Sequence, residues 1–224
     1  MFADITSANV VGYQNNALQE GATMIAPAFV DINASEEGVD LTKLIVGGDF
    51  ASEDVVIQTL TAEGYADKTY SFFKPRRGDW QWIDDNGETL SEGDVVFTAG
   101  TGLWIAGVDN CTITTAGQVS TSDRVIKLVD GAVACGNSTA VPLDLLSIVP
   151  SGEYASEDIV IQTLTADGYA DKTYSFFKPR RGDWQWIDDN GETLSEGDVV
   201  FPAGAGLWVA GVEGAFLTIP GPTL

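Results

Sequence analysis

The sequence predicts an all-β fold of two tandem homologous domains, each a β-sandwich or barrel-like structure of short antiparallel strands. Residues 51–108 return almost unchanged as residues 155–212. β-Branched and aromatic runs alternate with turn residues at spacings of about 8–12 residues. The 224 residues are enough for two hydrophobic cores. Because two copies of one unit share one fold, we expect domains at residues 1–108 and 109–224.

The repeated block carries the clearest strand signals. It differs from its copy at five positions, and most of these differences keep the size or charge of the side chain. The pair Asn86-Gly87 predicts a tight hairpin turn. Runs rich in β-branched and aromatic residues predict strands at residues 55–60, 68–73, 80–82, 94–97 and 103–106, and at the matching positions of the second copy.

Charge and composition exclude several classes of function. The chain has 11 basic and 33 acidic side chains, a formal net charge of −22, which repels nucleic acids and anionic membrane surfaces. It has no histidine, which excludes histidine-based catalytic triads and histidine-containing zinc sites. No apolar run approaches the roughly 18 residues needed to span a bilayer, so we expect no membrane insertion.

Two cysteines, Cys111 and Cys135, lie in strand-like surroundings without the spacing of a metal site. They are either two buried thiols or one disulfide, and we expect the disulfide, which requires an oxidising compartment. The first residues do not have the composition of a signal peptide. We therefore expect a mature extracellular or cell-surface protein whose signal peptide has been removed.

Two features of the hairpin region suggest ligands. Trp80, Trp82, Trp184 and Trp186 could form stacking platforms for sugars, although aromatic side chains on one strand face more often pack in a core. The loop of residues 84–88 has several oxygen-bearing side chains around a glycine, as calcium loops do, but hairpin turns favour the same residues. Calcium is therefore an alternative, and we expect no cofactor. Glycoside hydrolysis by paired carboxylates is a third hypothesis.

Two basic runs, at residues 74–77 and 178–181, contain 6 of the 11 basic side chains. Arg76, Arg77, Arg180 and Arg181 are either solvated turn residues or partners for acidic surfaces on a second copy.

The chain contains three recognisable motifs, Asn9-Val10-Val11-Gly12-Tyr13, the tryptophan-rich hairpin, and Gly100-Thr101-Gly102-Leu103-Trp104. In these motifs it resembles a group of uncharacterised secreted bacterial tandem-repeat all-β proteins. Residues 118–120 replace the first motif in the second copy. The resemblance implies secretion and a surface or extracellular role, and it implies no activity.

We therefore expect a non-enzymatic structural protein that assembles head-to-tail with copies of itself into a filament or another extracellular assembly. The internal junction at residues 110–115 resembles residues 214–219, and residues 113–116 resemble residues 5–8. A C-terminal strand of one molecule could thus pair with the N-terminal strand of the next. The assembly residues would be Ile5, Val10, Val11, Phe216, Leu217, Ile219 and the four arginines. The alternative is a carbohydrate-binding module that binds a polysaccharide on its duplicated tryptophan faces.

Overall fold

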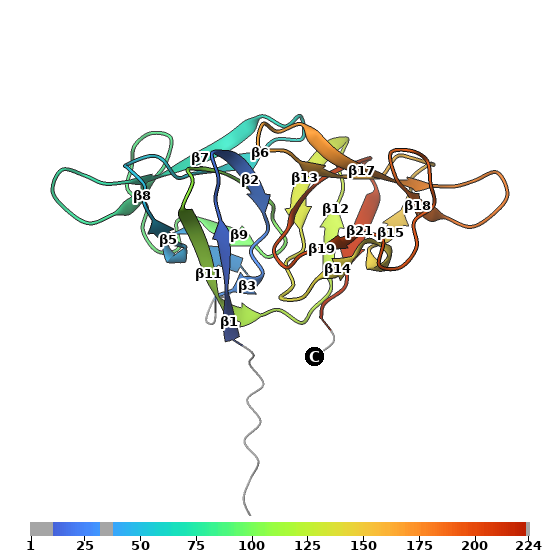
Figure 1. Ribbon diagram of the computed structural model, residues 1–224, viewed down its shortest axis with the longest axis horizontal. Helices are drawn as coiled ribbons and strands as arrows, with labels where there is room; N and C mark the ends of the chain where they lie inside the picture. Colours follow the sequence, from blue (N-terminus) through green and yellow to red (C-terminus); the bar gives the residue numbers. More distant parts are fainter. Residues whose placement is uncertain (1–10, 32–37, 223–224) are drawn as a thin grey trace, which may run out of the picture.

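The computed structural model describes residues 11–31 and 38–222. These residues form 21 strands and two single-turn 3-10 helices, and every ladder between strands is antiparallel (Figure 1). The predicted all-β class is confirmed. No helix in these ranges is long and apolar enough to cross a membrane.

The first half of the molecule contains two sheets and one short ladder. The five-stranded sheet runs β2 (Gly21–Ile25), β10 (Leu103–Gly107), β6 (Val56–Leu60), β7 (Ala66–Phe73) and β8 (Gln81–Ile83). In the second sheet, β11 (Cys111–Val119) pairs with β1 (Val11–Ala17), β3 (Phe29–Val30) and β5 (Ile45–Gly48). The ladder joins β4 (Gly38–Asp40) to β9 (Val96–Thr98), and the helix η1 is Leu41–Lys43.

The second half repeats this arrangement. Its five-stranded sheet runs β13 (Gly131–Gly136), β20 (Gly206–Gly211), β16 (Val160–Leu164), β17 (Ala170–Phe177) and β18 (Gln185–Ile187). Its second sheet places β21 (Ala215–Ile219) between β12 (Arg124–Lys127) and β15 (Val149–Gly152). The ladder joins β14 (Leu143–Asp144) to β19 (Val200–Phe201), and the helix η2 is Leu145–Ser147.

Strand pairing groups residues 11–119 into the first half and residues 124–219 into the second. Strand β11 pairs with β1, β3 and β5, all of which come from the first repeat. The expected boundary after Val108 therefore lies before β11, the strand that completes the first half. The chain passes from the first half to the second at residues 120–123. The sequence showed that the junction at residues 110–115 resembles residues 214–219, but it could not show which half this segment joins.

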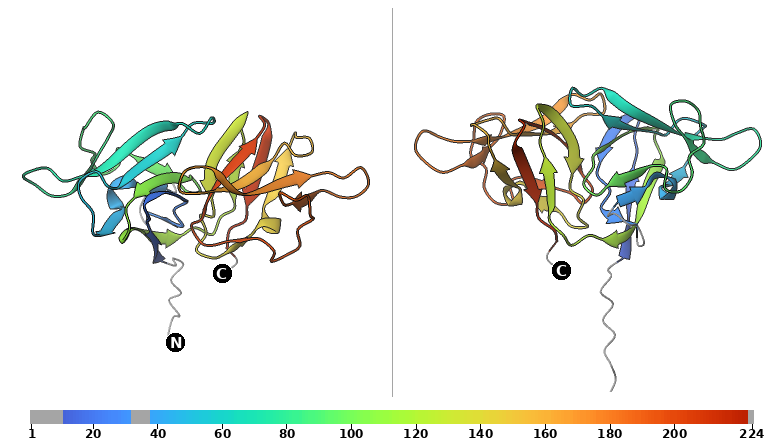
Figure 2. Two further views of the ribbon diagram at one scale, coloured as in Figure 1. Left: turned by 45° about the horizontal axis from the view of Figure 1, so that its top comes forward. Right: turned by 180° about the vertical axis from the view of Figure 1, so that it is seen from behind.

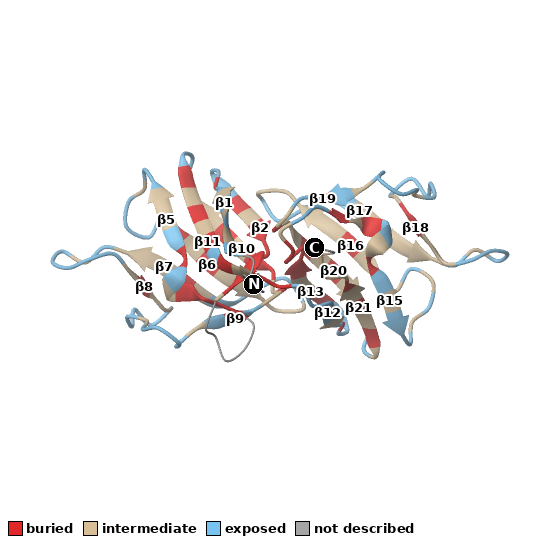
Figure 3. Cartoon of the chain, turned by 90° about the horizontal axis from the view of Figure 1, so that it is seen from below, coloured by how far each residue is buried: buried red, intermediate tan, exposed pale blue. Residues whose placement is uncertain are grey.

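Each half has its own cluster of buried apolar side chains, and the two clusters share no residue. Ile57 and Ile161 occupy matching places in these cores and are fully buried. Figure 3 shows the buried positions as bands that alternate with more exposed ones along β11 and β21. This two-residue period follows from the pleat, which turns alternate side chains toward the core.

An aspartate ties the single-turn helix of each half to a turn distant in sequence, and in the first half this residue, Asp40, is buried. Asp40 accepts hydrogen bonds from the N–H groups of Thr42 (2.8 Å) and Gly93 (2.6 Å). Burial alone would raise the pKa of Asp40. The hydrogen bond from the Thr42 hydroxyl, together with the two N–H groups and nearby Lys43, outweighs it, so the pKa lies below its ordinary value. Asp144 accepts the matching bonds in the second half. These contacts hold the residues that lead into β9 and β19.

The halves meet across an approximate twofold axis. The N–H of Ala22 donates to the carbonyl oxygen of Ala166 (3.1 Å), and that of Ala132 donates to the carbonyl oxygen of Ala62 (2.9 Å). Ala22 and Ala132 occupy matching places in β2 and β13. Each half therefore donates one of these two hydrogen bonds and accepts the other. Such an interface is isologous. Two isolated bridges show the same exchange, Ile25 with Ala205 and Cys135 with Thr101.

Glycines let the two backbones approach closely at this interface. A Cβ atom at Gly102 would lie 2.6 Å from the backbone nitrogen of Cys135 in the other half. A Cβ atom at Gly206, the matching residue, would lie 2.6 Å from the backbone carbonyl carbon of Met24. A glycine within a strand often marks a site where another backbone comes close. The Gly-x-Gly-Leu-Trp motif thus places a glycine where the halves touch.

We predict that Gly102→Ala and Gly206→Ala each lower the free energy of unfolding by about 1–3 kcal/mol, because the new methyl group would overlap backbone atoms of the other half. Urea unfolding followed by tryptophan fluorescence measures this loss. Gly47→Ala is the control, since its Cβ would meet only the Thr112 hydroxyl, at 3.0 Å. If all three variants were equally stable, the close contact between the halves would be contradicted.

Candidate functional site

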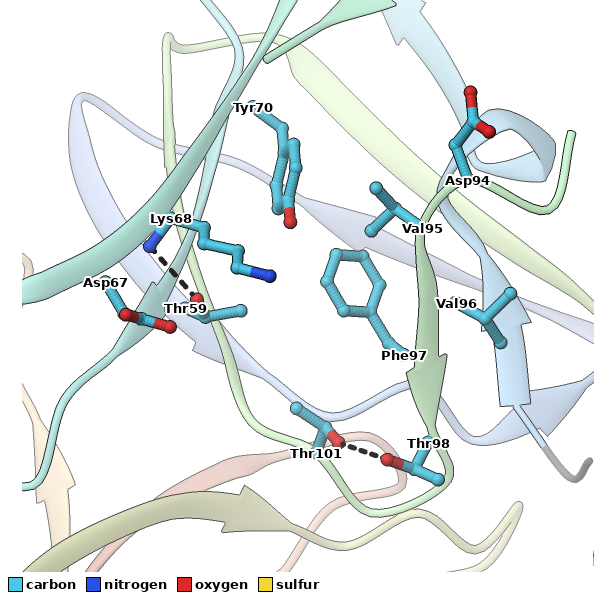
Figure 4. A pocket seen from close by; sticks show the side chains of 10 residues that line it. All are labelled: Thr59, Asp67, Lys68, Tyr70, Asp94, Val95, Val96, Phe97, Thr98 and Thr101. Atoms are coloured by element: carbon cyan, nitrogen blue, oxygen red, sulfur yellow. Dashed lines mark hydrogen bonds between the residues drawn. The ribbon is translucent and has the colours of Figure 1, made fainter. Parts of the chain in front are cut away.

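A cavity of about 330 Å³ lies against the five-stranded sheet of the first half (Figure 4). Lys68 and Tyr70 of β7 extend into this space, and Phe97 of β9 faces them. A cavity of about 460 Å³ in the second half is lined by the matching Lys172, Tyr174 and Phe201. Thr23 and Met24 from the first half also line this second cavity. The two cavities are therefore duplicates, and contact between the halves modifies the second.

Each of these cavities presents a tyrosine hydroxyl beside a lysine ammonium group. Tyr70 packs edge-on against Phe97, with ring centroids 6.0 Å apart. Burial, with a smaller effect from nearby aspartates, raises the pKa of Tyr70 above its ordinary value, and burial does the same for Tyr174. Both hydroxyls therefore stay protonated and can donate a hydrogen bond. A protonated hydroxyl and an ammonium group are both donors to an oxygen-bearing ligand.

The tryptophans of the two hairpins divide into a buried pair and a more exposed pair. Trp82 and Trp186 are each 3% exposed and belong to the cores, so they cannot serve as sugar platforms. Trp80 is 36% exposed and stacks on Phe72, with centroids 5.1 Å apart. The Lys74 ammonium lies 5.7 Å from the centroid of the Trp80 ring.

Trp184 repeats the arrangement of Trp80, stacking on Phe176 with Lys178 over its ring. It also borders a largely apolar groove of about 410 Å³ that includes Leu146 and Pro150. Of the four predicted ligand residues, Trp80 and Trp184 are thus the ones that remain accessible.

The basic runs at residues 74–77 and 178–181, here called the basic tips, connect β7 to β8 and β17 to β18. These hairpins lie at opposite ends of the elongated molecule (Figures 1 and 2). The four arginines, Arg76, Arg77, Arg180 and Arg181, are exposed. In the described part of the chain the ion pairs are those of Lys43 with Asp31 and with Glu92, so the arginines of the tips make none.

The C-terminal strand expected to join neighbouring molecules lies within its own half. Strand β21 is paired on both sides, by β12 and β15, and its Leu217 and Ile219 are each 1% exposed. Their burial contradicts their predicted role as assembly residues, because period-two alternation turns them toward the core. Phe216 is half-buried on the opposite face. Val11 is exposed on β1, and the strand that pairs with β1 among the described residues is β11. Ile5 and Val10 lie outside the described residues.

The expected disulfide is absent. Cys111 and Cys135 are free buried thiols, and they pack in the cores of different halves. Burial raises the pKa of both thiols, that of Cys135 to about 12, so both stay protonated near neutral pH. Each cysteine therefore acts as a small apolar side chain.

The loop suggested as a calcium site is organised by its own backbone. Asp84 accepts hydrogen bonds from the N–H groups of Glu88 (2.8 Å) and Asn86 (3.0 Å), and Asp188 does the same in the second copy. The N–H of Glu88, together with the other hydrogen bonds of the turn, lowers the pKa of Asp84. Across residues 11–31 and 38–222, no group of three or more cysteine, aspartate or glutamate side chains is placed to hold a metal ion.

A further cleft of about 370 Å³ opens between the two halves. Trp104 and Glu63 of the first half line it together with Trp208 and Asp167 of the second. The sequence analysis missed this site. The repeat showed that both tryptophans occur at matching places, but only the twofold packing brings them to one cleft.

No family model matches this chain, and no curated protein or solved structure matches it either. The resemblance to secreted bacterial tandem-repeat proteins therefore stays a prediction.

Proposed function

We propose that this chain is a non-enzymatic structural protein, secreted or at the cell surface, that assembles with copies of itself. The observation that carries the proposal is the pair of basic tips at opposite ends of a molecule with a net charge of −22. The arginines of the tips have no acidic partner within the described chain. An acidic surface of a second copy supplies such partners.

The contact involves side chains of the tips rather than an added strand. Strand β21 has both edges occupied, so it offers no free edge to a neighbour. A basic tip that meets an acidic surface is a heterologous contact, because the two surfaces differ, and such contacts continue into a filament or close into a ring. Opposite charges also speed the encounter and set its orientation.

We predict that Arg77→Glu/Arg181→Glu keeps the protein monomeric, near 23.7 kDa, while the wild type forms larger species that grow with concentration at low salt. Light scattering combined with size-exclusion chromatography measures the mass. Added salt should dissociate the wild-type species, because ions screen exposed charges beyond about 10 Å at 0.1 M.

The matched control is Lys68→Glu/Lys172→Glu, which changes the net charge equally but lies in the two cavities, away from the tips. It should assemble as the wild type does. A wild-type protein that stays monomeric at every concentration and salt level would refute self-assembly, and electron micrographs would then show only single particles.

The second candidate function is polysaccharide binding at the groove beside Trp184, where a half-buried aromatic ring borders a largely apolar depression. Aromatic rings of this kind bind the apolar faces of sugars. We expect a polysaccharide that binds this groove to change the tryptophan fluorescence when it is titrated into the protein. We expect the Trp184→Ala variant to lose that change. A flat response across a broad panel of polysaccharides would remove this candidate.

A further inference from the structure

The cleft between the halves is composite, because neither half forms it alone. The turn between β6 and β7 carries Glu63, and the turn between β16 and β17 carries Asp167. These turns meet near the middle of the long axis of the molecule (Figures 1 and 2). Trp104 of β10 and Trp208 of β20 complete the cleft.

Each tryptophan lies against the turn of the opposite half. A Cβ atom at Gly168 would lie 3.7 Å from Cζ2 of Trp104, and one at Gly64 would lie 3.7 Å from Cζ2 of Trp208. Asp167 and Glu63 directly precede these glycines. The cleft therefore contains two matching half-sites, each with an indole from one half and a carboxylate-bearing turn from the other.

An indole beside a carboxylate is suited to a cation. Tryptophan provides the strongest aromatic face for cations, and arginine is the cation most often found there. The planar guanidinium group of arginine can stack on the ring while its N–H groups donate to a carboxylate. The two half-sites differ only by a methylene, Glu63 against Asp167, and both keep the negative charge.

We propose that this cleft binds an arginine side chain from a basic tip of a second copy of the chain. The inference rests on the proposed function and names the acidic surface that receives the tip. The tips contain four of the five arginines of the chain, and all four are exposed. Because the tips lie at the ends of the molecule and the cleft lies near its middle, a tip cannot reach its own cleft. The contact therefore joins different molecules.

Two measurements on the full-length protein test this assignment. In the first, N-acetyl-arginine amide is titrated into isotope-labelled Arg77→Glu/Arg181→Glu protein, and the indole N–H signals are followed by NMR. The signals of Trp104 and Trp208 should shift in a saturable manner, while those of the buried Trp82 and Trp186 should stay in place. Unchanged Trp104 and Trp208 signals would overturn the assignment.

In the second, the mass of assembled species is compared between Glu63→Gln/Asp167→Asn and the control Glu88→Gln/Glu192→Gln. Both double variants remove two exposed carboxylates, but only the first pair lines the cleft. The cleft variant should remain monomeric and the control should assemble as the wild type does. If both assemble normally, the tips dock elsewhere, so the cleft assignment fails and the proposed function stands. If the wild type itself never assembles, both proposals fail.

Discussion

The close approach of two backbones at the centre of the molecule is the constraint on which the rest of the structure depends. The amides of Ala22 and Ala132 bond across the interface, and Gly102 and Gly206 leave no room there for a side chain. Because residues 51–108 and 155–212 are nearly identical and the two halves fold alike, these contacts are made twice. The duplication thus produces an isologous dimer within one chain.

The twofold packing of the halves determines the positions of the repeated side chains in the molecule. Twofold packing directs the two basic tips away from each other and brings Trp104 and Trp208 together. A single repeat would have one basic tip and half of a cleft. Under the proposed function, the basic tips at the ends and the acidic cleft in the middle are the surfaces that join copies of the chain.

Much of the fold could be predicted from local sequence. Alternating residues identified the strands of the repeated block, and Asn86-Gly87 identified the turn between Ile83 and Thr89, which form a bridge. Partners distant in sequence could not be predicted. The resemblance among the junction and the two chain ends suggested a joint between molecules, but β11 and β21 both pair within their own halves. Likewise, the spacing of the two cysteines could not show that they pack in different cores.

Amide hydrogen exchange at Ala22 and Ala132 tests the closure of the two halves most directly. Both amides donate a hydrogen bond across the interface, so their protection reports its stability. We predict that both exchange about as slowly as the amide of Ile105 in the core strand β10, and that they lose protection together. Exchange as fast as that of Asn86 in the exposed hairpin loop would show that the halves do not close on each other.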